Sequence, residues 1–114
     1  NSKKIDELKL ARNKTNKLLD ESKVLIGNKE KFYESIDKAL TIYLKTKLKI
    51  KNSDFKNEVI QIKLEQMNVE KNTVDLLFEI FENCQLARYT PINIDAMSDD
   101  YNKTKQFIKQ LEKY

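Results

Sequence analysis

The residues whose chemistry could support catalysis are few, and most lie in the C-terminal half of the chain. Asp75, Glu79 and Glu82 are spaced by four and three residues, which would place three carboxylates on one face of a helix. Asp99 and Asp100 form a second acidic pair. Paired carboxylates can act as general acid and base or hold a metal ion. Acids on a polar helix face usually lie in water, and we favour that interpretation for both clusters.

Most other catalytic chemistry is excluded by the composition. The 114 residues include no histidine, which removes the commonest general base, the histidine-activated nucleophiles and most zinc sites. The single glycine cannot form a phosphate-binding loop or a dinucleotide-binding fingerprint. We therefore predict that the chain is not an enzyme and that it has no cofactor and no metal site.

The only cysteine, Cys84, cannot form a disulfide within the chain, which is compatible with a reducing compartment. It falls on the apolar face of a predicted helix, so we expect a buried small hydrophobic residue rather than a reactive thiol. Arg88 follows four residues later. It would lower the pKa of the thiol only if both side chains were exposed.

Cys84 belongs to the stretch NCQLARYTP (83–91), which also holds the only proline and one of the two arginines. Pro91 cannot continue a helix, so a helix should end near Arg88 and Tyr89. In a structural interpretation, Arg88 opposes the helix dipole and Tyr89 packs its ring into the core. In a functional interpretation, Arg88 and Tyr89 form a partner-binding spot, because both residue types are enriched in interface hot spots.

The elements that position these residues are predicted to be helices. One glycine and one proline are too few for the turns of a sheet protein. Apolar residues recur at spacings of three and four, which predicts helices over 5–26, 30–48, 56–67, 71–88 and 96–113. The fold class is therefore all-α, a compact bundle of about five helices. The first two helices could form a tetratricopeptide-like hairpin, although the chain has no 34-residue repeat.

One segment also fits a strand. Residues 41–51, TIYLKTKLKIK, alternate apolar and basic side chains. We prefer a helix to about residue 48, because a lone strand would have no partner and lysines near a helix C-terminus oppose its negative dipole end.

The positive charge is concentrated at the N-terminus. The net charge is +4 and the sequence pI is about 9.0. Residues 1–31 contain nine Lys/Arg and five Asp/Glu, whereas residues 32–114 contain thirteen of each. A basic segment of this kind suits an anionic membrane surface or nucleic acid, and it is equally compatible with a solvated helix face. The candidate membrane-surface residues are Lys3, Lys4, Lys9, Arg12, Lys14 and Lys17.

Two stretches together resemble a known family. They are FYESIDKALTIYLKTKLKI (32–50) and NCQLARYTP (83–91), and they resemble the C-terminal cytoplasmic domain of BatD, the Bacteroides aerotolerance protein D. The residues that carry the resemblance are Phe32-Tyr33-Glu34, Ala39-Leu40, Tyr43-Leu44, Lys47-Leu48, Val69, Cys84, Ala87, Arg88, Tyr89 and Pro91. The chain departs from the family pattern at Lys51, where a proline is frequent, and at Asn68, where a glycine is frequent.

The resemblance implies an organisation and a function. Residues 1–28 would be a basic juxtamembrane helix that packs on or leads into a helical domain over 29–114. BatD-like proteins carry periplasmic domains and a membrane span before this domain, so we expect a span upstream of a chain that begins with Asn1. The domain would lie at the cytoplasmic face of a bacterial inner membrane. Residues 1–114 themselves contain no signal peptide and no apolar run long enough to span a membrane.

The function expected from this resemblance is non-enzymatic protein interaction in oxygen or stress tolerance. The implied partners are a MoxR-type AAA+ ATPase or von Willebrand factor A-domain Bat proteins. The alternative is a small basic nucleic-acid-binding protein, whose affinity would fall steeply with salt. The zero net charge of residues 32–114 argues against this alternative, so nucleic acid is not the expected partner.

Overall fold

Residues 2–114 fold into five α-helices and one short 3-10 helix. The computed structural model describes the backbone of residues 2–114 and the side chains of residues 6–114. Within these residues there is no strand, so the all-α prediction is confirmed, and every helix boundary lies within three residues of the predicted one. The elements are α1 (Ser2–Val24), α2 (Lys29–Lys47), η1 (Asn52–Asp54), α3 (Asn57–Gln66), α4 (Lys71–Leu86) and α5 (Ile94–Leu111).

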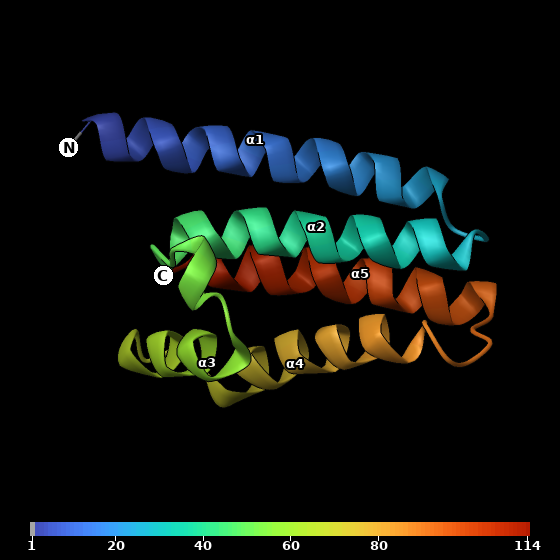
Figure 1. Ribbon diagram of the computed structural model, residues 1–114. Helices are drawn as coiled ribbons and strands as arrows, with labels where there is room; N and C mark the ends of the chain where they lie inside the picture. The colour runs from blue at the N-terminus through green and yellow to red at the C-terminus, as the bar shows by residue number, and fades with distance from the viewer. Residues whose placement is uncertain (1) are drawn as a thin grey trace.

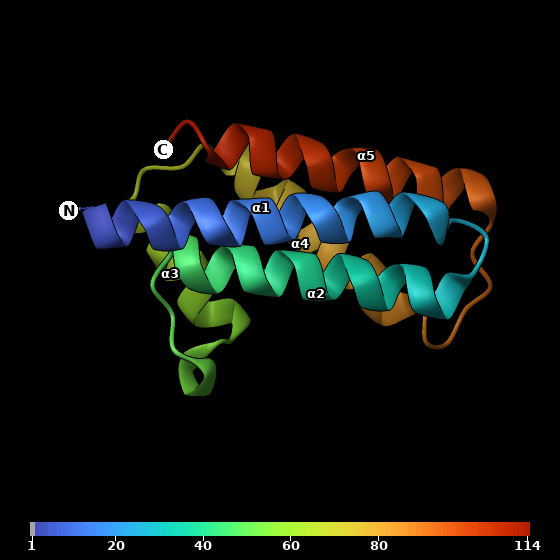
Figure 2. The same cartoon turned by 90° about the horizontal axis from the view of Figure 1, so that it is seen from above.

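The helices lie along the long axis of the molecule in three layers (Figure 1). The 23 residues of α1 rise about 34 Å at 1.5 Å per residue, which accounts for most of the 44 Å length. Seen from above, α1 lies over the line between α2 and α5, and α4 lies beneath them (Figure 2). α2 and α5 therefore form the middle layer. Both chain termini lie at the same end of the bundle (Figure 1).

The strand alternative for residues 41–51 is wrong, because α2 continues through Lys47. Lys49 then adopts a left-handed conformation with φ of 55°, and the Ile50 N–H donates to the Lys45 carbonyl over 2.9 Å. This arrangement is typical of a helix C-terminus. It buries Leu48 and Ile50 in the core, so the apolar side chains that suggested a strand are buried by a helix and its terminal turn.

The core lies between the layers and draws on every α-helix. The side chains with less than 2% exposure are Phe32, Phe107, Ile36, Leu40, Leu44, Ile60, Leu64, Leu77, Ile80, Ile108, Leu111 and Thr15. α1 contributes mainly small buried residues, including Ala11, Thr15 and Ser22. The Thr15 hydroxyl donates to the Ala11 carbonyl over 2.7 Å, which satisfies a polar group that burial would otherwise leave unpaired.

Two turns depend on a left-handed residue. Gly27, with φ of 104°, ends the α1 segment, and Asn68, with φ of 59°, ends the α3 segment. The Val69 N–H after Asn68 donates to the Leu64 carbonyl over 3.1 Å. Both positions follow the last residues of an apolar stripe, where glycine or asparagine is a signal for a helix end. Asparagine tolerates this conformation better than most residues other than glycine.

The connection between α4 and α5 departs from the expectation in one respect. α4 ends at Leu86, and Ala87 caps it with 4% exposure. Residues 87–90 then form a tight turn, in which the Tyr89 N–H donates to the Leu86 carbonyl over 3.0 Å. This turn leaves Tyr89 83% exposed, so the prediction that its ring packs into the core is wrong.

Candidate interaction site

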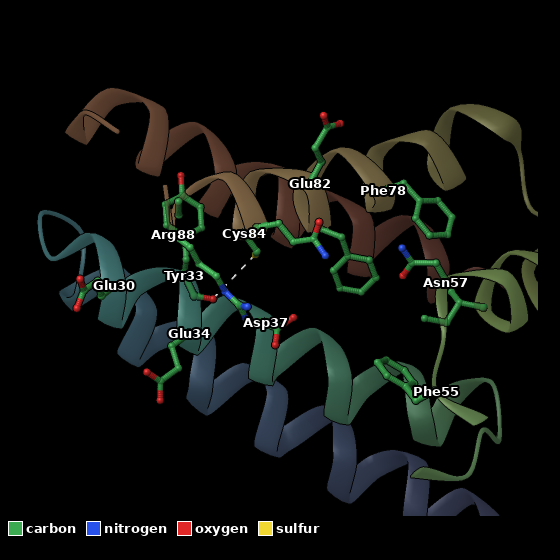
Figure 3. A pocket seen from close by; sticks show the side chains of 14 residues that line it. Glu30, Tyr33, Glu34, Asp37, Phe55, Asn57, Phe78, Glu82, Cys84 and Arg88 are labelled. Atoms are coloured by element: carbon green, nitrogen blue, oxygen red, sulfur yellow. Dashed lines mark hydrogen bonds between the residues drawn. The ribbon is translucent and has the colours of Figure 1, made fainter. Parts of the chain in front are cut away.

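A groove of about 620 Å³ runs between α2 and α4 and reaches the start of α3 (Figure 3). Arg88 and Glu30 lie at one end, and Phe55, Asn57 and Phe78 lie at the other (Figure 3). The residues that give the groove its apolar surface are Tyr33, Phe55, Ile60, Phe78, Phe81, Cys84 and Ala87. The acidic residues along it are Glu30, Glu34, Asp37 and Glu82. The groove thus combines aromatic surface with carboxylates.

Arg88 and Tyr89, the predicted partner-binding pair, are both exposed. Arg88 lines the groove and is close enough to Asp37 to act on it electrostatically. Desolvation at the groove wall raises the pKa of the Asp37 carboxyl, and the positive charge of Arg88 opposes that rise. Tyr89 follows Arg88 directly and points its ring into solvent, since no core contact holds it. Both side chains are therefore available to a partner.

Cys84 is half-buried in the groove. Its thiol lies 3.9 Å from the Tyr33 carbonyl oxygen, toward which it can donate a weak hydrogen bond. Burial, reinforced by the negative charges of Asp37 and Asp100, raises the pKa of Cys84 to about 12. Arg88 acts in the opposite direction but is outweighed. The thiol is protonated at neutral pH, as expected of an unreactive cysteine, but the side chain is half-buried rather than buried as predicted.

The two acidic clusters differ in exposure. Asp75, Glu79 and Glu82 are exposed as expected, and Glu79 pairs with Lys103 over 3.4 Å. Asp99 is also exposed, but Asp100 is only 3% exposed, so the expectation that this pair lies in water is wrong for Asp100. Among residues 6–114, no group of three acidic or cysteine side chains is placed to hold a metal ion.

Asp100 is buried because it accepts two hydrogen bonds across the core. The Tyr33 hydroxyl donates to Oδ2 over 2.6 Å, and the Asn83 amide donates to Oδ1 over 2.9 Å. Burial and this bond to Asp100 raise the pKa of Tyr33, so its hydroxyl is protonated at neutral pH. The cluster joins α2, α4 and α5 beneath the groove.

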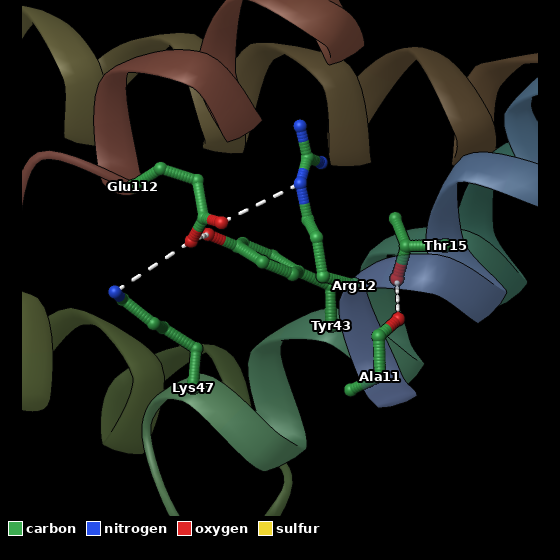
Figure 4. Close-up of polar contacts among 6 residues, drawn as sticks. All are labelled: Ala11, Arg12, Thr15, Tyr43, Lys47 and Glu112. Atoms are coloured by element: carbon green, nitrogen blue, oxygen red, sulfur yellow. Dashed lines mark hydrogen bonds and ion pairs between the residues drawn. The ribbon is translucent and has the colours of Figure 1, made fainter. Parts of the chain in front are cut away.

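The predicted membrane-surface residues fall into two groups. Lys9, Lys14 and Lys17 are exposed on α1. Arg12 instead forms an ion pair with Glu112, at 3.4 Å from Nε to the carboxylate, and lies over the Tyr43 ring (Figure 4). Its Nη1 atom is buried without a hydrogen-bond partner. The side chains of Lys3 and Lys4 lie outside the described residues.

Further lysines extend the basic character of this end of the molecule. A shallow depression of about 740 Å³ separates α1 from the C-terminal part of α2. Lys14, Lys45, Lys49 and Lys51 line it, and Glu7 is the one acid among the lining residues whose side chains the structure describes. The exposed Leu10 side chain adds apolar surface beside these lysines. The arrangement matches what an anionic surface requires, which is positive charge next to a small apolar patch.

The groove itself was not predicted from the sequence. Its signal was present, because Glu30, Glu34 and Asp37 are spaced by four and three residues along one face of α2. What could not be read from the sequence was that Phe78 and Phe81 of α4 would face this acidic row across a gap. That juxtaposition depends on the distance between two helices that are separated in sequence by 23 residues.

Comparisons with protein-family models, with curated proteins and with solved structures found no significant match to this chain. In the part of the chain that the structure describes, no helix combines the length and the apolar character that crossing a membrane would require.

Proposed function

We propose that this chain is a non-enzymatic docking domain at the cytoplasmic face of a bacterial inner membrane, within a BatD-like protein that acts in oxygen or stress tolerance. Its partner would be a MoxR-type AAA+ ATPase or a von Willebrand factor A-domain Bat protein. Lys9, Lys14 and Lys17 would face the anionic lipid surface, where each basic residue contributes about 1 kcal/mol of attraction.

The observation that carries the proposal is the exposure of Arg88 and Tyr89 at the end of the groove. Tyr89 is 83% exposed, and no internal contact accounts for an aromatic residue at this position. Arginine and tyrosine are the residue types that most often dominate binding energy at protein interfaces. Leu86 and Ile94, which are 45% and 58% exposed, extend the apolar surface on either side in sequence. The resemblance to BatD includes Arg88 and Tyr89 and supplies the candidate partners.

The test is co-expression of the chain with the MoxR-type AAA+ ATPase and the A-domain protein that the resemblance predicts beside its gene. We expect Arg88→Glu to abolish co-purification of the partner, because glutamate cannot replace the hydrogen bonds and the stacking of the guanidinium group at the proposed contact. The thermal midpoint should stay within about 2 °C of the parent value, since exposed substitutions rarely change stability by more than about 0.5 kcal/mol.

Lys38→Glu is the matched control. Lys38 is exposed on α2 and does not line the groove, and its substitution changes the net charge by the same amount. Co-purification should survive in this variant. If Arg88→Glu lowered the thermal midpoint in proportion to the loss of partner, Arg88 would have a structural role at the end of α4, and the proposed docking surface would be wrong.

A further inference from the structure

The acidic row of the groove belongs to one face of α2. Glu30, Glu34 and Asp37 are four and three residues apart, so their side chains follow one another over about 10 Å of helix. Glu82 of α4 also lines the groove, although its carboxylate points away from α2 (Figure 3). A segment bound in the groove would therefore meet a line of negative charge along one edge.

These carboxylates are only weakly compensated within the molecule, since Arg88 acts on Asp37 without forming an ion pair with it. Within residues 6–114, none of the four forms an ion pair, and Arg88 is the only cation among the residues that line the groove. Other acids of the molecule behave differently, because Glu79 pairs with Lys103 and Glu112 pairs with Arg12. Four negative charges against one positive charge leave the groove complementary to a cationic partner.

The apolar surface of the groove is unusually aromatic. Phe55, Phe78 and Phe81 are each only partly buried, and the rings of Phe78 and Phe81 meet edge to face with centroids 6.2 Å apart. Aromatic rings contribute most of the burial energy when they become covered at an interface. A partner that covered these rings would gain apolar contact in the same groove where it neutralised the carboxylates.

We propose that the groove binds an amphipathic, lysine- or arginine-rich helix of a partner protein. An α-helix with side chains is about 10–12 Å across, so a cavity of about 620 Å³ accepts the side chains of one helix face rather than the whole helix. Apolar side chains at positions i, i+3 and i+7 would contact Phe78 and Phe81. Basic side chains at one edge would meet Glu30, Glu34 and Asp37 at matching spacing. This inference rests on the proposed docking function and names the chemistry of the partner.

The experiment uses residues 1–114 and a fluorescein-labelled 15-residue peptide in which leucine and lysine are arranged to form an amphipathic helix. Fluorescence anisotropy at two salt concentrations measures its Kd. We expect the double variant Glu34→Arg/Asp37→Arg to raise Kd at least about tenfold, because two attractive contacts become repulsive. The matched control is Glu65→Arg/Asp75→Arg, which makes the same change in net charge at exposed residues outside the groove and should change Kd less than about twofold.

Several results would overturn the inference, and the first three come from the binding measurements. The first is an equal loss of peptide affinity in the groove variant and the control variant. The second is a leucine–glutamate peptide that binds as tightly as the leucine–lysine peptide. The third is self-association of the free chain at the concentrations used, which would make a second copy the occupant. Ring resonances of Phe78 and Phe81 that stay unchanged when the peptide is added would also overturn it. Circular dichroism checks that each variant is folded.

The two proposals fail separately. If the peptide binds the groove but Arg88→Glu still co-purifies the partner, the proposed docking function fails and the groove inference stands. If Arg88→Glu loses the partner but the peptide does not bind, the groove inference fails alone.

Discussion

Two hydrogen bonds of the same kind join α2 to α5 at different points along the bundle. The Tyr33 hydroxyl donates to Asp100, and the Tyr43 hydroxyl donates to Glu112, each over 2.6 Å. The tyrosines are ten residues apart on α2, and the acids are twelve apart, Asp100 on α5 and Glu112 at its C-cap. Burial and the neighbouring carboxylate raise the pKa of both tyrosines, so both hydroxyls are donors at neutral pH.

The surroundings of the two bonds are different. Asp100 is 3% exposed, and its second oxygen accepts from the neutral amide of Asn83. The Glu112 side chain is 38% exposed, and its carboxylate pairs with two cations, Arg12 at 3.4 Å and Lys47 at 3.6 Å (Figure 4). The buried carboxylate of Asp100 therefore has a neutral amide as its second partner. The more exposed carboxylate of Glu112 has two cations as its further partners.

This difference shows how burial decides the energetic role of one interaction type. An exposed ion pair contributes little, because water and salt compete with it. Removing a buried carboxylate that accepts from two donors lowers the free energy of unfolding strongly. Its loss leaves those donors without partners in a region that water does not reach. We therefore expect Asp100 to hold the fold together and Glu112 to make only a modest contribution.

The largest effect should come from Asp100→Ala. It leaves the Tyr33 hydroxyl and the Asn83 amide unsatisfied and creates a small cavity, so we expect a loss of about 3 kcal/mol in the free energy of unfolding. Urea denaturation measures this loss. Asp99→Ala is the matched control, because Asp99 is exposed and adjacent, and it should cost less than about 0.5 kcal/mol. Equal losses in the two variants would contradict the contrast between the buried and exposed acids.

The second effect concerns the thiol beside Tyr33. A pKa of about 12 lowers the thiolate fraction of Cys84 at pH 8 about thousandfold relative to an ordinary thiol with a pKa of 9.0. The higher nucleophilicity of a more basic thiolate offsets part of this decrease, so we expect alkylation to be about 40-fold slower in the folded chain than in urea. Iodoacetamide labelling followed by mass spectrometry gives both rates.

The pH dependence of the alkylation rate gives a second test of the raised pKa of Cys84. The rate for the folded chain should keep rising with pH beyond 9, where the rate for the unfolded chain levels off. Arg88→Gln should slow the folded reaction further, because Arg88 is the group that lowers the thiol pKa. A folded rate equal to the unfolded rate at pH 8 would mean that the groove does not shelter Cys84.

The helices could be predicted from the sequence because their signals are local. Apolar spacing, the stops at Gly27 and Asn68, and Pro91 after the α4 helix each act within a few residues. The burial of Thr15 on α1 was also readable, since it falls in the apolar stripe and its hydroxyl can bond within its own helix.

The partners of the buried polar groups could not be predicted. Asp100 lies three residues after Met97 and four before Thr104, so its spacing places it on the buried face of α5 and Asp99 off it. The spacing does not identify its partner Tyr33, which lies 67 positions away in sequence. One helical position separates the two acids, and the rotation of α5 decides which one enters the core. The prediction that the Tyr89 ring packs into the core was wrong for a related reason. The exposure of this ring depends on the turn that residues 87–90 adopt rather than on the residue type.

The smallest effect on stability is expected at the more exposed of the two hydrogen bonds, between Tyr43 and Glu112. Glu112→Ala removes the acceptor of the Tyr43 hydroxyl and the partner of Arg12 and Lys47. Because the site reaches water, these groups can be solvated after the change, and we expect a loss of only about 1 kcal/mol, or about 4 °C in the thermal midpoint.

The matched control for Glu112→Ala is Glu34→Ala, since Glu34 is an exposed acid that forms no ion pair among residues 6–114. Its loss should leave stability within about 0.5 kcal/mol of the parent. Salt distinguishes the mechanism, because 1 M NaCl should shrink the Glu112 effect, which is partly ionic, and leave the Asp100 effect largely intact. If Glu112→Ala cost as much as Asp100→Ala, the buried Nη1 atom of Arg12 would be the reason, since an unpaired guanidinium would then remain in a region closed to water.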